Sequence, residues 1–518
     1  MNKQPLIAVV GMDGIFPGAP DLDVFWTHIV KGIDQSVPAP RHRWIASPED
    51  RLSDGLEPDR TYSRNACLIQ DFHFDPHGFD LDPEVTRYLD PVHQLTLTAG
   101  KRAVTGCSTA DVDPQRVDTI LAAIALPTDS ASAFTRTILG AAIARKLFPA
   151  ETVLKNEILR SRALASRVDG LPAALLAAEM GFGGNCFTLD AACASSTYAV
   201  KLACDALTFG RADMVVTGGV SRPECLYTQT GFSQLQALSR SGRCAPFDHR
   251  ADGLVVGEGV GILVLKRLSD AIDQGDTIHG VIHGIGLSND MRGNLLAPES
   301  RGQVRAMQAA YAMAAWRPSD VDLIECHGTG TRAGDTTEIE SLIQLWQDES
   351  RESGPCAIGS VKSMIGHLLT AAGAAGLIKV LLAMRHRTLP PSINFDRPPE
   401  DSPLPNSPFR VQTQPEPWEK GGSDEPMRAA VSAFGFGGIH AHILLQEWPS
   451  PSVQTPDPKS HAIAVVSKDE VPPAQPMAIV GMDVAVGSLT HLKSFENAFF
   501  QGCSAIYQRP MDRWKGAD

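Results

Sequence analysis

The stretch Leu189-Asp190-Ala191-Ala192-Cys193-Ala194-Ser195-Ser196 places one cysteine among small residues, directly before a helical pattern. Apolar residues recur at helical spacing from Tyr198 to Leu207 and Gly210 ends the pattern, which predicts a helix over this segment. Because a helix N-terminus favours negative charge, we expect a lowered pKa for the Cys193 thiol and a nucleophilic thiolate. A single cysteine in such a place is more often a small packing residue, so the interpretation depends on what accompanies it.

Two downstream motifs each carry a histidine where a strand-like run ends. Glu325-Cys326-His327-Gly328-Thr329-Gly330-Thr331-Arg332-Ala333-Gly334-Asp335 follows the mostly apolar run 321–324, and its Gly and Thr residues do not readily continue a strand or start a helix. Gly359-Ser360-Val361-Lys362-Ser363-Met364-Ile365-Gly366-His367 also follows a short strand-like run, and it precedes an Ala/Gly/Leu-rich helix over about 368–384. Catalytic side chains commonly lie at such junctions. One cysteine and two histidines therefore form a candidate nucleophilic site.

Strand-like and helical patterns alternate along the chain. Residues 214–217 and 261–265 are typical of buried strands, and Gly218-Gly219 is expected to end the first of them. Residues 303–315 and 338–346 are typical of amphipathic helices. This alternation predicts a layered α/β architecture.

The motifs in this order resemble those of β-ketoacyl synthase (ketosynthase) domains of fatty acid and polyketide synthases. The resemblance runs from Ile7 to about Glu447, and each motif is only moderately specific alone, but their order and spacing together are very specific. Besides the cysteine and histidine motifs it includes Ala8-Val9-Val10-Gly11-Met12, Ala245-Pro246-Phe247-Asp248 followed by Gly257-Glu258-Gly259, and Phe434-Gly435-Phe436-Gly437-Gly438. The resemblance implies a thiolase-like fold, with two similar α/β halves stacked as five layers, and a homodimer or pseudo-dimer.

The resemblance also implies a role for each matching residue of the site. Cys193 would take an acyl group from a carrier-protein thioester, and its backbone N–H and that of Phe436 would form an oxyanion hole. His327 and His367 would stabilise the enolate that forms when malonyl-carrier protein loses carbon dioxide, because fixed imidazole N–H groups can donate to a developing oxyanion. The implied enzyme is a β-ketoacyl-[acyl-carrier-protein] synthase, which extends a fatty acid or polyketide chain by two carbons through decarboxylative Claisen condensation.

Supporting residues and partners follow from the same resemblance. Lys362 and Asp335 would support the pocket, and Phe434 would flank or gate the nucleophile together with Phe436. No metal or bound organic cofactor is implied. Phosphopantetheine takes part, but it arrives covalently attached to an acyl carrier protein.

One departure from the family pattern leaves alternatives open. Ile439-His440-Ala441-His442 stands where family members commonly have Thr-Asn-Ala-His. This change is the only support for a non-elongating domain that docks or scaffolds carrier proteins. A thiolase is the other alternative, but it would need a second cysteine near the C-terminus, and the loop Phe436-Gly437-Gly438 carries none.

An internal repeat links the two ends of the chain. Ala8-Val9-Val10-Gly11-Met12-Asp13 recurs as Ala478-Ile479-Val480-Gly481-Met482-Asp483, and the match continues without a gap. The further identical pairs are Leu22 and Leu492, Phe25 and Phe495, Gly32 and Gly502, Pro40 and Pro510, Arg43 and Arg513, and Trp44 and Trp514.

The resemblance and the repeat together predict four segments. Residues 1–265 form the N-terminal ketosynthase half with the nucleophile, and residues 266–448 form the C-terminal half with both histidines. Residues 449–476 are rich in Pro, Ser, Lys and Asp and indicate a linker. Residues 477–518 are the truncated start of a second ketosynthase-like domain, so the arrangement resembles the ketosynthase and chain-length-factor pair of polyunsaturated fatty acid synthases.

Composition limits the other classes of function. The chain has 518 residues with 43% hydrophobic and 20% charged residues, as in globular proteins. Its formal net charge of −13 argues against nucleic-acid binding, and no apolar stretch approaches the length of a membrane span. The ten cysteines include no C-x-x-C pair, so we expect reduced thiols and a cytoplasmic location.

Overall fold

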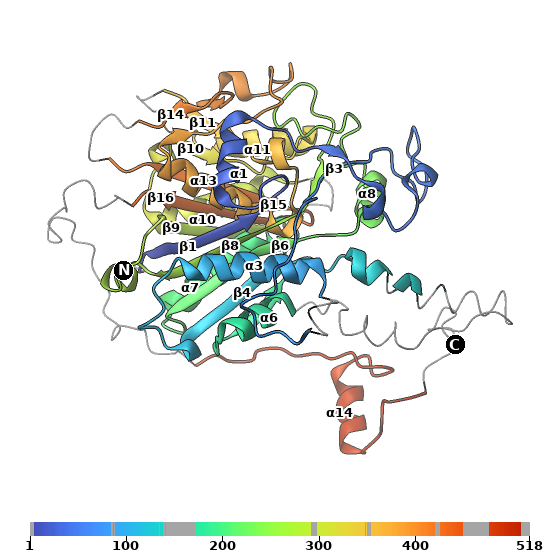
Figure 1. Cartoon of the computed structure of the whole chain (residues 1–518). Coiled ribbons are helices and arrows are strands. Elements are labelled where there is room, and N and C mark those ends of the chain that lie inside the picture. Colours follow the sequence, from blue (N-terminus) through green and yellow to red (C-terminus); the bar gives the residue numbers. More distant parts are fainter. Residues whose placement is uncertain are drawn as a thin grey trace.

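One large β-sheet organises the chain, and helices pack on its faces (Figure 1). The sheet has eleven strands in the spatial order β13-β11-β10-β15-β16-β9-β1-β8-β6-β4-β5. The computed structural model describes residues 5–83, 86, 89–133, 135–137, 140, 171–291, 298–347, 349, 354–419, 425–448 and 476–508. The strands of the sheet are β1 (Ile7–Ile15), β4 (Val117–Ala123), β5 (Cys186–Leu189), β6 (Met214–Ser221), β8 (Gly259–Arg267), β9 (Gly280–Asn289), β10 (Leu323–Glu325), β11 (Cys356–Gly359), β13 (Phe409–Val411), β15 (Arg428–Gly435) and β16 (Ile439–Gln446).

The two halves of the sheet repeat one topology. From the centre outward the N-terminal strands follow the order β1-β8-β6-β4-β5, and the C-terminal strands follow β9-β16-β15-β10-β11, with β13 as an additional strand at the outer edge. In each half the first strand in the chain lies at the centre, and the second and third lie at the outside. The inner pairs are antiparallel and the outer pairs are parallel in both halves. This correspondence agrees with the expectation of two similar α/β halves.

Helices form three layers around the two halves of the sheet. One outer layer packs against β1, β4 and β8, the middle layer lies between the halves, and the other outer layer packs against β9 and β16. The outer helices are α3 (Pro91–Thr105) and α6 (Leu171–Met180) on one side and α10 (Ser300–Ala314) and α11 (Arg332–Leu345) on the other, and the middle helices are α7 (Ser195–Thr208) and α13 (Ala372–Arg385).

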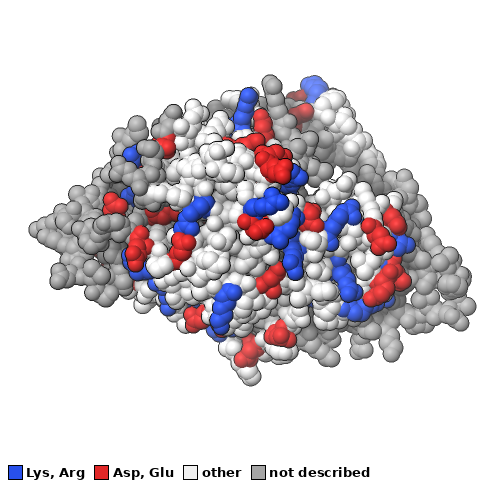
Figure 2. All heavy atoms as spheres, turned by 90° about the horizontal axis from the view of Figure 1, so that it is seen from above, with Lys and Arg blue, Asp and Glu red and all other residues white. Residues whose placement is uncertain are grey.

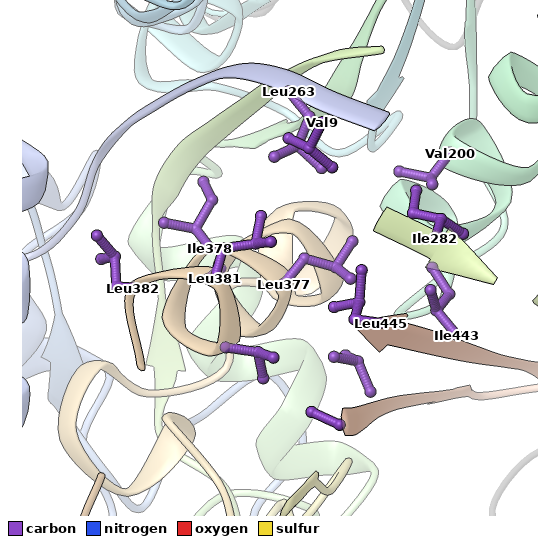
Figure 3. Packing of buried hydrophobic residues seen from close by; sticks show 14 of the residues in the cluster. Val9, Val200, Leu263, Ile282, Leu377, Ile378, Leu381, Leu382, Ile443 and Leu445 are labelled. Atoms are coloured by element: carbon purple, nitrogen blue, oxygen red, sulfur yellow. The ribbon is translucent and has the colours of Figure 1, made fainter. Parts of the chain in front are cut away.

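The middle layer is the centre of the hydrophobic core. Leu377 and Leu381 of α13 lie between Val9 and Leu263 of one half of the sheet and Leu445 of the other (Figure 3). Every residue of α13 except Arg385 is buried, and apart from Lys379 the buried residues are apolar or glycine, as expected of a helix covered by sheet on two faces. The first turn of α7 and the segment before α13 hold the site described below.

Shorter elements complete the described chain. The remaining helices are α1 (Leu22–Lys31), α8 (Cys225–Gln234), α9 (Leu268–Asp273), α12 (Lys362–Ile365) and α14 (Leu492–Phe500), and the remaining strands are β2 (Val37–Pro38), β3 (Asn65–Cys67), β7 (Val256–Gly257), β12 (Thr388–Leu389) and β14 (Glu416–Pro417).

The expected helices and strands are present, but several boundaries differ: the helix expected over 338–346 already begins at Arg332, the helix expected from about 368 begins at Ala372, and the strand expected over 321–324 is Leu323–Glu325. Strand β6 does not end at Gly218-Gly219 but continues through them to Ser221. A Cβ added at Gly218, whose φ is +135°, would lie 2.1 Å from the carbonyl oxygen of Gly261 in the neighbouring strand β8. The glycine therefore permits a close approach of two strands rather than a turn.

The predicted linker and second copy are only partly covered by the described residues. Residues 449–475 lie outside the described ranges, as do Pro510, Arg513 and Trp514 of the repeat. Residues 476–508 are described and contain α14, whose side chains include none that is buried.

Candidate active site

Cys193 lies in a tight turn between β5 and α7. Its predecessor Ala192 has a φ of +50°, a left-handed conformation that costs a non-glycine residue about 1–2 kcal/mol. The Ser195 hydroxyl fixes the turn, since it accepts the Ala191 N–H at 2.7 Å and donates to the Ala192 carbonyl at 2.5 Å. Strain of this kind persists where the surrounding structure over-determines it, often at functional sites.

The expected lowering of the Cys193 pKa is wrong for this structure. Helix α7 begins at Ser195, so Cys193 precedes the helix, and its side chain is buried. Burial raises the pKa of the thiol to about 11, against the opposing effects of the Phe436 N–H, the Lys362 ammonium and the N–H of Cys193 itself. The thiol therefore rests protonated, and the backbone N–H groups of Phe436 and Cys193 favour its thiolate form.

The loop Phe434-Gly435-Phe436 packs directly against the cysteine turn. A Cβ added at Gly435 would lie 3.2 Å from the backbone nitrogen of Cys193 and 3.3 Å from the carbonyl oxygen of Ala191. These distances are tighter than ordinary van der Waals contact, so a side chain at this position would have to displace the cysteine turn. The structure thus brings the loop of Phe434 and Phe436 against the Cys193 turn.

His327 lies in a loop whose backbone is held by two carboxylates and one ammonium group. The four successive N–H groups of residues 327–330 donate to two buried carboxylates of α11: Glu338 accepts the first two and Asp335 the last two, at 2.7–3.2 Å. On the other side, Lys362 Nζ donates to the His327 carbonyl at 2.6 Å. Burial raises the pKa of Asp335 and of Glu338 to about 7 each.

His367 follows α12 and faces His327 with one ring edge. The two ring centroids are 5.4 Å apart with nearly perpendicular planes. His367 Nδ1 accepts the Leu369 N–H at 3.1 Å, so the ring proton of the neutral imidazole is on Nε2, which is buried and has no partner among the described residues. That Nε2–H is an unused donor.

Both imidazoles are neutral at physiological pH. Burial lowers the pKa of His327 and of His367 well below the usual range, and the neighbouring Lys362 charge lowers both further. A neutral imidazole with a free N–H can stabilise a developing oxyanion without giving up a proton, because the donor is fixed before the charge appears. The loop that packs on the Cys193 turn also carries Phe434, whose ring lies 5.9 Å from that of His327, and His327 faces His367, so the three predicted groups lie around one site.

Two residues of the site were not foreseen in these roles. Glu338 was not assigned to the site, although it lies three residues after Asp335 and therefore on the same face of one helix. His440, the departure from the family pattern, pairs through Nε2 with Asp290 Oδ1 at 2.8 Å and places its ring 5.2 Å from that of Phe434. Asp290 is 150 positions away in the chain, so no local sequence pattern predicts this pair.

Other classes of site receive no support from the described part of the chain. No group of three or more His, Cys, Asp or Glu side chains there is arranged to hold a metal ion. Within the same residues, every helix is too short or too polar to cross a membrane.

Comparison with known proteins decides the family. The sequence model described as "Beta-ketoacyl synthase, N-terminal domain" matches residues 4–271, the corresponding C-terminal domain matches 279–396, and "Ketoacyl-synthetase C-terminal extension" matches 398–476. The chain belongs to the β-ketoacyl synthase family. The predicted resemblance to this family is thereby confirmed.

Curated relatives of this ketosynthase are polyketide synthases. The chain is 37% identical over 453 residues to a phenolphthiocerol/phthiocerol polyketide synthase of Mycobacterium tuberculosis, a match that covers 86% of the chain and 29% of that protein. It is 32% identical to polyketide synthase PksL of Bacillus subtilis, covering 86% of the chain and 9% of that protein. The chain thus spans less than a third of the length of these relatives.

Solved structures place the fold among ketosynthases. The structure called "PfaC Keto synthase-Chain length factor" matches 99% of this chain and 54% of its own, with a TM-score of 0.86 and 35% identity. The ketosynthase from module 6 of the bacillaene synthase of Bacillus subtilis 168 matches 86% of this chain and 72% of its own, with a TM-score of 0.73 and 32% identity. These neighbours confirm the thiolase-like α/β fold.

Proposed function

We propose that this ketosynthase condenses an acyl group held on Cys193 with malonyl-carrier protein and so extends a fatty acid or polyketide chain by two carbons. The observation that carries the proposal is the sharing of one site by the Cys193 sulfur, two backbone N–H groups and two neutral imidazoles. Each group meets a separate need of the reaction: a nucleophile, donors for a tetrahedral oxyanion, and donors for an enolate.

In the first step Cys193 Sγ attacks the carbonyl carbon of the acyl thioester. The thiol proton is transferred to the departing phosphopantetheine sulfur, so the carrier leaves as a free thiol. The N–H groups of Cys193 and Phe436 would bind the tetrahedral oxyanion, since both favour negative charge at the sulfur. Because the resting thiol is protonated, deprotonation accompanies the transfer.

In the second step malonyl-carrier protein loses carbon dioxide and forms an enolate. His327 and His367 would donate to the enolate oxygen, with His367 acting through Nε2. The enolate carbon attacks the acyl carbonyl on Cys193, the C–S bond breaks, and the cysteine sulfur regains a proton. Lys362, Asp335 and Phe434 support this arrangement, the first two by holding the His327 loop.

The partner in both steps is an acyl carrier protein, whose phosphopantetheine arm delivers the thioesters; the ketosynthase holds no cofactor of its own. The support is the similarity to polyketide synthases. Charge alone does not mark a docking surface, because Lys and Arg are interspersed with Asp and Glu on the face in Figure 2. Free cysteines throughout the described chain agree with a cytoplasmic setting.

A second ketosynthase-like domain completes the proposed assembly, either a chain-length-factor domain or a second copy of this one. The similarity to the structure called "PfaC Keto synthase-Chain length factor" supports the former. The proposed domain limits remain 1–265, 266–448, 449–476 and 477–518. Strand β5 lies at the end of the sheet order, with only β4 beside it in the described chain. Phe187 on this edge and Leu202 on α7 are both 39% exposed, as expected of a strand edge that pairs with another domain.

Intact-mass spectrometry after incubation with acyl thioesters tests the proposal. We expect the chain to gain one acyl mass and Cys193→Ala to gain none, while Cys186→Ala, which removes an exposed thiol on β5, loads like the unmodified chain. His327→Ala and His367→Ala should still load, but should lose about 10²–10³-fold in malonyl decarboxylation.

The same experiment separates the alternatives. Acylation of Cys193→Ala at the original rate would show that another residue is the nucleophile. Absence of loading with every thioester would instead favour the non-elongating docking role.

A further inference from the structure

Glu325, which the mechanism above leaves unused, is buried two residues before His327. It is the last residue of β10, and its carboxylate has two partners. Oε1 accepts a hydrogen bond from the Val361 N–H at 2.6 Å, and Oε2 accepts one from Lys379 Nζ at 2.6 Å. Both charged side chains are buried, with 2% of Glu325 and 1% of Lys379 exposed.

These two contacts connect the segments that carry both histidines. Glu325 leads directly into the His327 loop, and Val361 begins the turn of α12 that holds Lys362. Lys379 is on α13, the helix that follows His367. One carboxylate therefore fixes the His327 loop to the elements immediately before and after His367.

The local packing is arranged around this pair. Gly376 lies one turn before Lys379 on α13, and a Cβ added there would lie 3.1 Å from Glu325 Cγ. That distance is tighter than ordinary van der Waals contact, so glycine leaves the room that the glutamate side chain occupies.

Stability alone does not account for charges at this place. Burying an ion pair costs desolvation of both groups, and apolar residues of similar volume often give equal or greater stability. Lys379 is the only charged residue of α13 inside the core, since Arg385 at its end is exposed. A directional pair can fix a geometry that apolar packing leaves adjustable.

We propose that Glu325 and Lys379 are a positioning pair that sets the arrangement of His327 relative to His367, and so supports malonyl decarboxylation but not acyl transfer to Cys193. This inference rests on the proposed function. It predicts that the variants lose decarboxylation but keep acyl loading, because the nucleophile and the Phe436 N–H belong to other segments, the turn before α7 and the loop after β15.

The test measures both half-reactions in three variants and a matched control. Glu325→Gln keeps an acceptor for the Val361 N–H but removes the charge, Lys379→Met removes the ammonium, and the double variant removes both charges together. The control is Lys266→Met, which breaks another buried pair: Lys266 Nζ is 2.6 Å from Asp276 and both side chains are 0% exposed. Lys266 also donates to Ser108 and Gln274 and thus stabilises a different part of the fold.

We expect Glu325→Gln to lose about 100-fold in malonyl decarboxylation, the loss that a displacement of about 1 Å can cause, with acyl loading of Cys193 near the original rate. The double variant should unfold nearer the original temperature than either single variant, because no unpaired charge remains, but its decarboxylation should stay low. Lys266→Met should lose thermal stability and keep the ratio of the two rates.

Two results would overturn the inference. One is unchanged decarboxylation in the double variant, which remains informative if a single variant does not fold. The other is a parallel loss of loading and decarboxylation in all variants, including the control, as a purely structural pair would give. Failure of the unmodified chain to load any acyl group would instead reject the proposed function.

Discussion

The two copies of the internal repeat share a set of identical residues at the same spacing but lie in different surroundings. In the first copy, β1 pairs with β8 and β9, and Val10 is 0% exposed. In the second copy, the matching residues 478–483 form no strand, and Val480 is 96% exposed. The same alternation of apolar residues therefore makes a strand only where neighbouring strands complete its hydrogen bonds.

The segments that follow are alike in both copies. Phe16 and Ala19 exchange two backbone hydrogen bonds across a turn, as do Val486 and Leu489 at the same offset. Helices α1 and α14 begin at equivalent leucines, and each is followed by a glycine of positive φ. Turns and helices close their hydrogen bonds locally, so they form without the rest of the sheet, whereas the strand depends on tertiary structure.

The largest expected difference between the copies concerns one aromatic pair. Phe25 is 0% exposed with its ring 4.2 Å from that of Phe16, and Phe495 is 37% exposed. Phe25→Ala should therefore cost about 3–5 kcal/mol of unfolding free energy through a lost contact and a cavity. Phe495→Ala should change it by less than about 0.5 kcal/mol. Urea unfolding followed by tryptophan fluorescence measures both.

Equal destabilisation of the two variants would contradict the difference in surroundings between the copies. That result would mean that the second copy packs on the main body as tightly as the first. Equal stability of both variants and the original chain would mean that α1 contributes little to the cooperative core.

A smaller difference between the copies should appear in how the paired aspartates Asp13 and Asp483 affect the pH dependence of stability. Burial raises the pKa of Asp13 to about 7, although Arg102 opposes the shift, whereas the Val484 and Leu492 N–H groups lower the pKa of the exposed Asp483. Because the folded chain binds the Asp13 proton more tightly than the unfolded chain does, stability should fall as the pH rises from about 4 to 7.

Substitution by asparagine isolates this effect. At pH 8, Asp13→Asn should gain about 1–3 kcal/mol relative to the unmodified chain, since one pKa unit corresponds to about 1.4 kcal/mol, and at pH 4 the gain should vanish. Asp483→Asn should leave the pH profile of global unfolding unchanged. A gain at pH 8 that persists at pH 4 would show that packing, rather than titration, explains the Asp13 variant.

The same contrast between local and tertiary structure explains what could be predicted from the sequence. The order of the motifs is enough to predict the fold and to predict that Cys193, His327 and His367 belong to one site. Helix positions followed from periodicity, but β6 runs through Gly218-Gly219 because β8 approaches it closely, which only the three-dimensional structure reveals.

Electrostatics could be predicted less well than residue identity. The Cys193 pKa was expected to fall at a helix start, and burial reverses the direction, because desolvation depends on residues distant in the chain. The partner of His440 likewise lies far away in the sequence, at Asp290 before α10. Residue type and spacing identify groups that can take part in the chemistry, whereas the tertiary surroundings set the charge and the partners of those groups.

The smallest expected difference between the copies lies at the paired helix-ending glycines. Gly32 and Gly502 have φ values of +62° and +65°, which alanine adopts only at a cost of about 1–2 kcal/mol. A Cβ at Gly32 would also lie 2.9 Å from Ile393 Cγ2, whereas nothing lies within 4 Å of one at Gly502. Gly32→Ala should therefore lower the urea midpoint, while Gly502→Ala should leave it unchanged and weaken amide protection only within α14, measured by hydrogen exchange. Since the backbone strain is the same at both positions, a midpoint shift in both variants would show that α14 unfolds together with the main body.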